Sequence, residues 1–222
     1  MLRPHAGKEP SEPRWHRRKE ERPAEILDAA LQEFVTRGYA ATRLEDVARR
    51  AGCTKGTIFL YFPNKEELFK AMVRQIVVPS IEQHELLAEQ HQGSSRELLV
   101  RLMHQRWDLL VDSPSSALPK LMFAEAGQFP ELARFYVDEV GVRSHALFSR
   151  VLREGIARGE FREMDTEATA KVMMAPLLVA ALWKHSFEPH CHVQIDQTRY
   201  FEASLDLLLS GIARPADGGI RS

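Results

Sequence analysis

The chain has 222 residues, of which 44% are hydrophobic, and carries a formal net charge of −1 at pH 7, so it can hold one small and one medium domain with a core. Its two cysteines, Cys53 and Cys191, exclude a disulfide framework and favour a cytoplasmic protein. The N-terminus lacks the apolar core of a signal peptide. The longest apolar run, Val172 to Trp183, contains Pro176 and is too short to span a bilayer, so no membrane contact is expected.

Charge is divided unevenly along the chain. Residues 1–80 contain 15 Lys and Arg against 11 Asp and Glu, whereas residues 81–222 contain 15 against 20. A basic N-terminal part before an acidic body favours nucleic-acid binding at one end, although charged runs often only solvate a surface.

The first 21 residues are rich in Pro, Arg, Lys and Glu and show no apolar period, so we predict a disordered basic arm over residues 1–21. The basic residues around Trp15 form either a solvated tail or an arm that contacts phosphates or the minor groove. A first helix is predicted from about Pro23 to Arg37, with Gly38 just past its end.

Residues 42–62, TRLEDVARRAGCTKGTIFLYF, predict two short helices joined by a tight turn at Gly52, a helix-turn-helix over about residues 43–62. Thr42 and Glu45 have the spacing of a capping box at the start of the first helix. Thr54 is expected to cap the second, which should run to about residue 62.

The second helix of this pair has an unusual outer face. At about 100° per residue, Ile58 and Phe62 point into a core while Gly56 and Leu60 point away from it. An outward glycine lets another molecule approach the backbone closely, and an apolar Leu60 suits a thymine methyl group. The alternative is an ordinary helical hairpin within a core, which leaves the outward apolar side chains unexplained.

The run from Ile26 to Val73 resembles the DNA-binding domain of the TetR/AcrR family of bacterial transcription regulators. The features that carry the resemblance are Ala29, Ala30, Phe34, Gly38-Tyr39, Thr42, Lys55-Gly56-Thr57, Tyr61-Phe62-Pro63, Lys65 and Leu68-Phe69. It implies a helical homodimer, most often a repressor, that binds palindromic double-stranded operator DNA and releases it when a small-molecule effector enters the C-terminal domain. In this reading Thr42 and Lys65 contact phosphates at helix N-termini. The DNA-binding residues it implies are Thr42, Thr54, Lys55, Gly56, Thr57, Phe59, Leu60, Tyr61 and Lys65.

Helical periodicity continues through the rest of the chain, so the predicted fold is all-α with about nine helices. A three-helix DNA-binding domain over residues 22–80 is followed by a larger ligand-binding and dimerisation domain over residues 81–213 and a disordered tail over 214–222. Asn64 should cap a long helix, kinked near Pro79, that alone touches both domains and acts as a lever between them.

The last two long helices, about residues 166–185 and 195–212, are apolar on nearly all faces. Such helices are buried on every side, either as an internal pair or against a partner chain. The family resemblance favours the partner, since it implies a four-helix bundle between two subunits.

An aromatic and methionine-rich set of side chains predicts a site for a small apolar or aromatic effector, although each residue alone is typical of a core. The candidates are Met103, His104, Trp107, Phe123, His145, Phe148, Met173 and Trp183. Residues 123–136 resemble AefR-like members of the family. No metal or cofactor site is predicted, because the histidines near Cys191 lack regular ligand spacing.

No phosphate-binding loop, nucleophile elbow or zinc-protease motif occurs, so we predict that the chain is not an enzyme. The competing interpretation is a helical ligand-binding protein or small enzyme with a vestigial DNA-binding head. That interpretation is disfavoured, because a vestigial head has no reason to keep Lys55, Gly56, Thr57, Tyr61 and Lys65.

Overall fold

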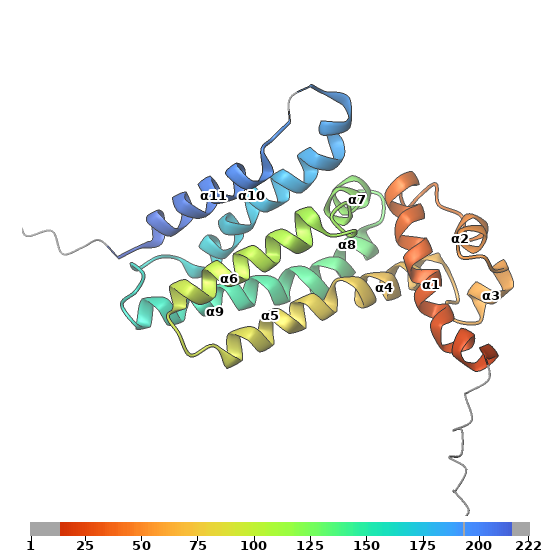
Figure 1. Cartoon of the computed structure of the whole chain (residues 1–222), viewed down its shortest axis with the longest axis horizontal. Helices are drawn as coiled ribbons and strands as arrows, with labels where there is room; N and C mark the ends of the chain where they lie inside the picture. Colours follow the sequence, from red (N-terminus) through yellow and green to blue (C-terminus); the bar gives the residue numbers. More distant parts are fainter. Residues whose placement is uncertain (1–13, 193, 215–222) are drawn as a thin grey trace, which may run out of the picture.

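The computed structural model describes residues 14–192 and 194–214, so most of the predicted arm and tail lies outside it. The described residues form helices and contain no β-strand (Figure 1). The helices are α1 (Arg14–Arg37), α2 (Leu44–Arg50), α3 (Lys55–Phe59), α4 (Lys65–Ile76), α5 (Val78–Gln90), α6 (Ser95–Trp107), α7 (Leu118–Glu125), α8 (Pro130–Tyr136), α9 (Arg143–Ala157), α10 (Thr166–Ser186) and α11 (Gln197–Ile212).

Two π-helical segments lengthen these helices: η1 (Asp108–Asp112) continues α6, and η2 (Val137–Val142) joins α8 to α9. Since α4 and α5 are also consecutive, the described residues make nine helical rods, which confirms the predicted all-α fold. None of these helices has the length and apolar character needed to cross a bilayer.

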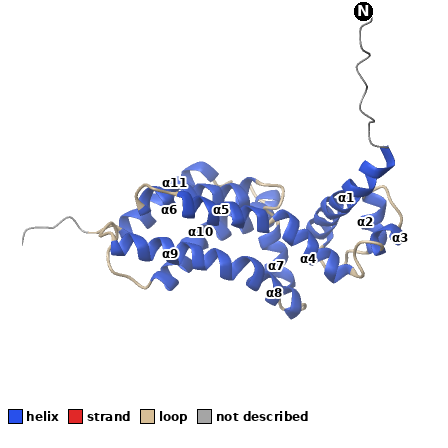
Figure 2. Ribbon diagram, turned by 90° about the horizontal axis from the view of Figure 1, so that it is seen from below, coloured by secondary structure: helices blue, strands red, loops and turns tan. Residues whose placement is uncertain are grey.

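The molecule has a head at one end and an elongated body. Helices α1 to α3 form the head, and α4 leads from it into the long helices of the body (Figures 1 and 2). Helices α10 and α11 lie side by side along one edge of the body. The predicted kink near Pro79 is a break at Val77, between α4 and α5.

Helix α1 begins at Arg14, so the predicted start of this helix near Pro23 is wrong. The predicted disordered arm is likewise wrong for residues 14–21, which are helical. This stretch consists mostly of Arg, Lys and Glu, which have high helix propensity. The absence of an apolar period does not by itself exclude a helix.

The predicted capping box at Thr42 is also wrong. Arg43 occupies the N-cap position of α2, and its side chain makes no capping hydrogen bond. The Thr42 hydroxyl instead lies 2.7 Å from the Gly38 carbonyl oxygen and 3.1 Å from that of Glu33, so it closes the turn that follows α1. Gly38 permits this turn because its φ is +82°, a value that favours glycine.

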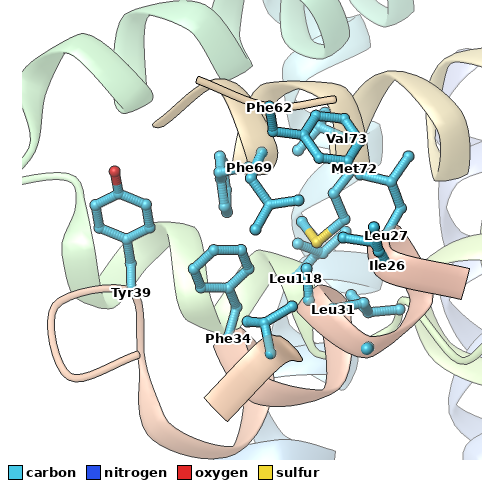
Figure 3. Close-up of a cluster of buried hydrophobic side chains, with 14 of the residues drawn as sticks. Ile26, Leu27, Leu31, Phe34, Tyr39, Phe62, Phe69, Met72, Val73 and Leu118 are labelled. Carbon is cyan, nitrogen blue, oxygen red and sulfur yellow. The ribbon is translucent and has the colours of Figure 1, made fainter. Parts of the chain in front are cut away.

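The head and the body share one hydrophobic core. Phe34 of α1 and Phe69 of α4 are fully buried in a cluster that also contains Leu118 and Met122 of α7 (Figure 3). Figure 3 shows Leu118 among the side chains of α1 and α4. The predicted domain boundary near residue 80 therefore does not coincide with a gap in the packing.

Candidate DNA-binding and effector sites

Helix α3 is held by a cap at its start and by one buried side chain. The Thr54 hydroxyl oxygen accepts a hydrogen bond from the Thr57 backbone N–H at 3.1 Å, and the two threonine hydroxyls lie 2.9 Å apart. Ile58 is fully buried and anchors the helix to the head. The predicted start at Thr54 is confirmed, although the helix ends at Phe59 rather than residue 62.

The opposite side of α3 exposes large apolar groups to solvent. Leu60 is 80% exposed and Phe59 is 46% exposed. A methyl group added at Gly56 would have only the Thr54 hydroxyl within 4 Å, at 3.7 Å, so the backbone here is open to the outside. An open backbone flanked by exposed apolar groups is the surface that a helix needs in order to enter the major groove.

A cation lies at the edge of this surface. The Lys55 ammonium pairs with the Glu45 carboxylate at 2.7 Å and lies 5.5 Å from the centre of the Phe59 ring. The hydrogen bond from Lys55 lowers the pKa of Glu45. Since both side chains are about half exposed, this ion pair is weak and can exchange for a phosphate contact.

Thr42 and Lys65 do not point outward. Thr42 is 2% exposed. The Lys65 ammonium lies 2.8 Å from the Tyr39 carbonyl oxygen and 3.2 Å from those of Ala40 and Thr42. An ammonium has three N–H donors, so these three carbonyls use all of them.

Lys65 also lies 4.5 Å from the centre of the Tyr39 ring, and its burial lowers its pKa. This geometry does not support the implied phosphate contacts from the Thr42 and Lys65 side chains, because both groups are committed to the turn after α1. The exposed cation at this place is Arg43, which the family pattern did not single out.

A cavity of about 350 Å³ lies in the body beneath the head. Helices α6, α7, α8, α9 and α10, both π-helical segments and Val77 contribute to its wall. Its lining is apolar apart from a few groups, and Phe123 and His145 are the two predicted effector residues that line it. The complete lining is Val77, Arg106, Leu109, Leu110, Ser115, Leu118, Pro119, Met122, Phe123, Ala126, Ala133, Tyr136, Val137, Val140, Gly141, Ser144, His145, Met174 and Leu178.

The other six predicted effector residues lie away from this cavity. Met103, Phe148 and Met173 are closed into the core between α6, α9 and α10. The rings of His104 and Trp107 pack on Phe201 of α11 with centroid separations of 4.9 and 4.8 Å.

The sixth, Trp183, packs against Phe187 at 5.1 Å. Residue type alone identifies an apolar side chain but does not tell which neighbouring helix covers it, so the sequence could not show which candidates line this cavity.

The cavity contains a charged group that the sequence did not reveal. Arg106 is 5% exposed, and one terminal nitrogen of its guanidinium donates a hydrogen bond to the Ser144 hydroxyl. Ser144 in turn donates to the Val140 carbonyl oxygen at 2.7 Å. The Arg106 Nε is buried and has no hydrogen-bond partner, and burial lowers the pKa of the guanidinium.

The cavity wall is connected directly to the head. Glu125, at the end of α7, accepts a hydrogen bond from the Tyr39 backbone N–H at 2.9 Å. The Tyr39 ring packs edge-on against Phe129 at 4.8 Å, and Arg74 of α4 pairs with Glu139 of η2 at 2.9 Å. The prediction that the long helix alone joins head and body is therefore wrong.

The histidines near Cys191 do not form a cluster. Within residues 14–192 and 194–214, no three His, Cys, Asp or Glu side chains come together as a metal site. The His185 Nε2 lies 2.9 Å from the Ser116 hydroxyl instead.

Two family models match the chain. The model described as "Bacterial regulatory proteins, tetR family" matches residues 26–72, and "Tetracyclin repressor-like, C-terminal domain" matches residues 89–192. The finer resemblance to AefR-like members stays a prediction.

Relatives over most of the chain are transcription regulators. The HTH-type transcriptional regulator YhgD of Bacillus subtilis, which is uncharacterised, is 30% identical over 178 residues, 74% of this chain and 85% of its own. The fatty acid metabolism regulator protein of the same organism is 25% identical over 198 residues, 87% of this chain and 98% of its own.

Solved structures share the fold. The regulator FadR of Bacillus subtilis in complex with stearoyl-CoA has a TM-score of 0.68 at 23% identity, with 85% of this chain and 98% of that chain covered. A regulator from Saccharomonospora viridis in complex with choline has a TM-score of 0.72 at 20% identity, with 88% and 99% covered. The outward face of α3, the helical body and these matches together show that the chain belongs to the TetR family of bacterial transcriptional regulators.

Proposed function

We propose that the protein is a repressor that reads its operator with the outer face of α3 and leaves the DNA when a small effector fills the cavity. The observation that carries the first part is the exposure of Leu60 and Phe59 beside the open backbone at Gly56. Large apolar groups gathered on one exposed helix face indicate an interaction surface. A vestigial head has no reason to keep such a face, which disfavours the ligand-binding or enzymatic alternative.

Phosphate contacts in this proposal come from exposed groups around α3. Lys55 and Arg43 supply positive charge, and Tyr61 lies at the end of the helix with its side chain partly exposed. The Thr54 hydroxyl is exposed at its start. Such contacts fix the position of the head on the duplex, whereas side chains at Thr57, Phe59 and Leu60 meet base edges.

Two copies of the chain pair through α10 and α11 in this proposal. Val172 and Val179 of α10 are 60% and 50% exposed, and Leu207 of α11 is 73% exposed. This exposure rules out a fully internal pair of helices and leaves an apolar strip for a partner. A dimer of this kind presents two α3 helices about 34–36 Å apart, the spacing of successive major grooves.

Sedimentation of the full chain tests the dimer. We expect Val179→Glu to give monomers and to lose operator affinity, because it places a charge in the apolar strip. Leu86→Glu is the matched control, since Leu86 of α5 is also 51% exposed but lies outside the strip. A wild-type protein that sediments as a monomer at micromolar concentration contradicts the pairing.

Two helices, α4 and α7, couple the cavity to the head. Val77, at the break after α4, lines the cavity. Helix α7 also lines the cavity, and its Glu125 accepts a hydrogen bond from the Tyr39 N–H. An effector that favours a shifted α7 and α4 changes the spacing of the two heads. A coupling free energy of about 1–3 kcal/mol is typical of such systems.

Reciprocity tests the coupling. If the effector weakens operator binding, operator DNA must weaken effector binding by the same factor. Glu125→Gln should reduce this factor, because the amide accepts a weaker hydrogen bond from Tyr39 than the carboxylate does. Equal effector affinity with and without operator contradicts allosteric release.

Support for a small-molecule effector comes from the cavity and from the similar folds found with stearoyl-CoA and with choline. Those two ligands differ in charge and size, so the choice of effector has to come from this cavity. We further infer that the protein acts in the cytoplasm and without catalysis, in keeping with a family of transcription regulators.

A further inference from the structure

We propose that the effector is an apolar molecule with a single carboxylate, and that Arg106 binds this carboxylate inside the cavity. This inference rests on the proposal that the cavity is the effector site. It goes further by assigning the chemical class of the effector and the residue that recognises it.

The guanidinium of Arg106 is buried without a counter-charge. Its side chain lines the cavity at 5% exposure, and no acidic side chain of the described residues forms an ion pair with it. One terminal nitrogen bonds to Ser144, and the buried Nε has no partner. Because an unpaired buried charge is costly, a site of this kind is complete only with an anion against it.

The rest of the lining contains no group that competes for this role. No Asp, Glu or Lys lines the cavity. Burial lowers the pKa of His145, whose imidazole therefore remains neutral at pH 7, and raises the pKa of Tyr136, which keeps its proton. The cavity thus carries one net positive charge at neutral pH.

A carboxylate fits that charge better than other head groups do. The guanidinium fork matches a planar carboxylate with two parallel hydrogen bonds, and Nε is the donor still available for one of them. A phosphate monoester carries about −1.5 to −2 at pH 7 and would leave excess negative charge in an apolar site. A quaternary ammonium would bring two cations together.

The remaining wall suits an apolar body. Leu110, Leu118 and Met122 are buried lining residues, whereas Phe123 and Val137 line the same cavity at 65% and 54% exposure and so mark its mouth. Both π-helical segments lie close to the charge: η1 begins two residues after Arg106, and η2 carries Val140, whose carbonyl oxygen accepts a hydrogen bond from Ser144. Such segments often occur at functional sites because they redirect side chains.

Matched ligands test the proposal on the full-length protein. We would titrate decanoate and 2-naphthoate, each against its methyl ester, by isothermal calorimetry below micellar concentrations. At least one acid is expected to bind about tenfold or more tightly than its ester, a difference of about 1.4 kcal/mol. Decyltrimethylammonium is expected not to bind.

Variants then assign the effect to one side chain. Arg106→Met should bind acid and ester within about twofold of each other, since only the ionic contact is removed. Arg101→Met is the matched control, because Arg101 lies on the same helix but is exposed, and it should keep the wild-type preference. Arg106→Lys should keep part of the preference, because it retains the charge without the fork.

Stability and operator binding are measured in the same samples. Ligand-free Arg106→Met should melt at or above the wild-type temperature, because it replaces a buried unpaired charge with an apolar chain. If it fails to fold, the comparison is made with Arg106→Lys. Equal binding of acid and ester by the wild type, or no binding of either acid, overturns the carboxylate proposal.

The proposed function is judged separately, from operator release. If the neutral ester releases operator DNA to the same extent as the acid does, the proposal that the cavity is the effector site is retained. Only the proposal that the effector carries a carboxylate is then contradicted. If an acid binds through Arg106 but does not change operator affinity, the proposal of carboxylate binding is retained. The proposal of allosteric release is then contradicted.

Discussion

The head and the body depart from the usual burial pattern in opposite ways. At the end of α3 in the head, Phe59 and the C-cap residue Leu60 are exposed to water. In the cavity of the body, the Arg106 guanidinium is buried among apolar side chains. Each arrangement costs free energy in the isolated chain, and we propose that a partner of matching chemistry relieves it: the bases of DNA in one case and an anion in the other.

The contrast between the two faces of α3 should produce the largest effects. Ile58→Ala should lower the free energy of unfolding by about 2–5 kcal/mol, because Ile58 is fully buried. Leu60→Ala, 80% exposed, should change it by no more than about 0.5 kcal/mol but weaken preference for particular base pairs by about 1–3 kcal/mol. Denaturant unfolding and operator titrations measure the two quantities, and a strongly destabilised Leu60→Ala would place that side chain in the core.

Acid should destabilise the body through a buried histidine that is neutral in the folded state. Burial lowers the pKa of His84 from 6.5 to about 4, with Arg106 adding to the shift, so the folded state binds fewer protons than the unfolded one. Stability then falls as the pH drops from 6.5 towards 4, by up to about 3 kcal/mol. Unfolding curves of His84→Gln should lack this component, and identical pH dependence of variant and wild type would contradict it.

The two lysines beside the DNA-binding face should behave differently. Lys65→Met should lower the stability of the head by about 1–3 kcal/mol, because it removes the donor from three backbone carbonyls. Lys55→Met should leave the stability nearly unchanged. It should make the plot of log operator affinity against log salt concentration less steep by about one released counterion. If only Lys65→Met changed the salt dependence of operator affinity, the result would contradict these roles and show that Lys65 contacts a phosphate.

Gly56→Ala should change the stability of the protein and its operator affinity in opposite directions. Within the head the added methyl group meets only the Thr54 hydroxyl, at 3.7 Å, so helix propensity should stabilise the protein by up to about 1 kcal/mol. In the complex the same methyl group occupies the space needed for DNA, and we expect operator affinity to fall by about tenfold or more. Unchanged operator affinity would show that the duplex does not approach the α3 backbone.

The sequence predicted the helices and the outer face of α3 because both follow from local periodicity. Ile58 and Leu60 lie on opposite sides of α3, as their spacing indicates. The roles of Thr42 and Lys65 were assigned by resemblance and missed the turn at Gly38, because carbonyl contacts depend on how α1 and α4 approach each other.

The cavity was even less predictable. Arg106 lies between Gln105 and Trp107 near the end of α6, and a basic residue at such a position is ordinarily exposed at the end of a flexible stem. Only the packing of α9 against α6 brings Ser144 to the guanidinium and buries it. Glu125 likewise gains its role from a contact across 86 residues of sequence.

Selection of DNA from a random duplex pool by the full-length protein tests the central claim most directly, since it asks whether the outer face of α3 reads a sequence. We predict recovery of a palindrome with half-sites about one helical turn apart, and loss of defined positions within each half-site when Leu60→Ala repeats the selection. Recovery of no common sequence by the wild type, or of the same sequence with unchanged preference by Leu60→Ala, would contradict the account.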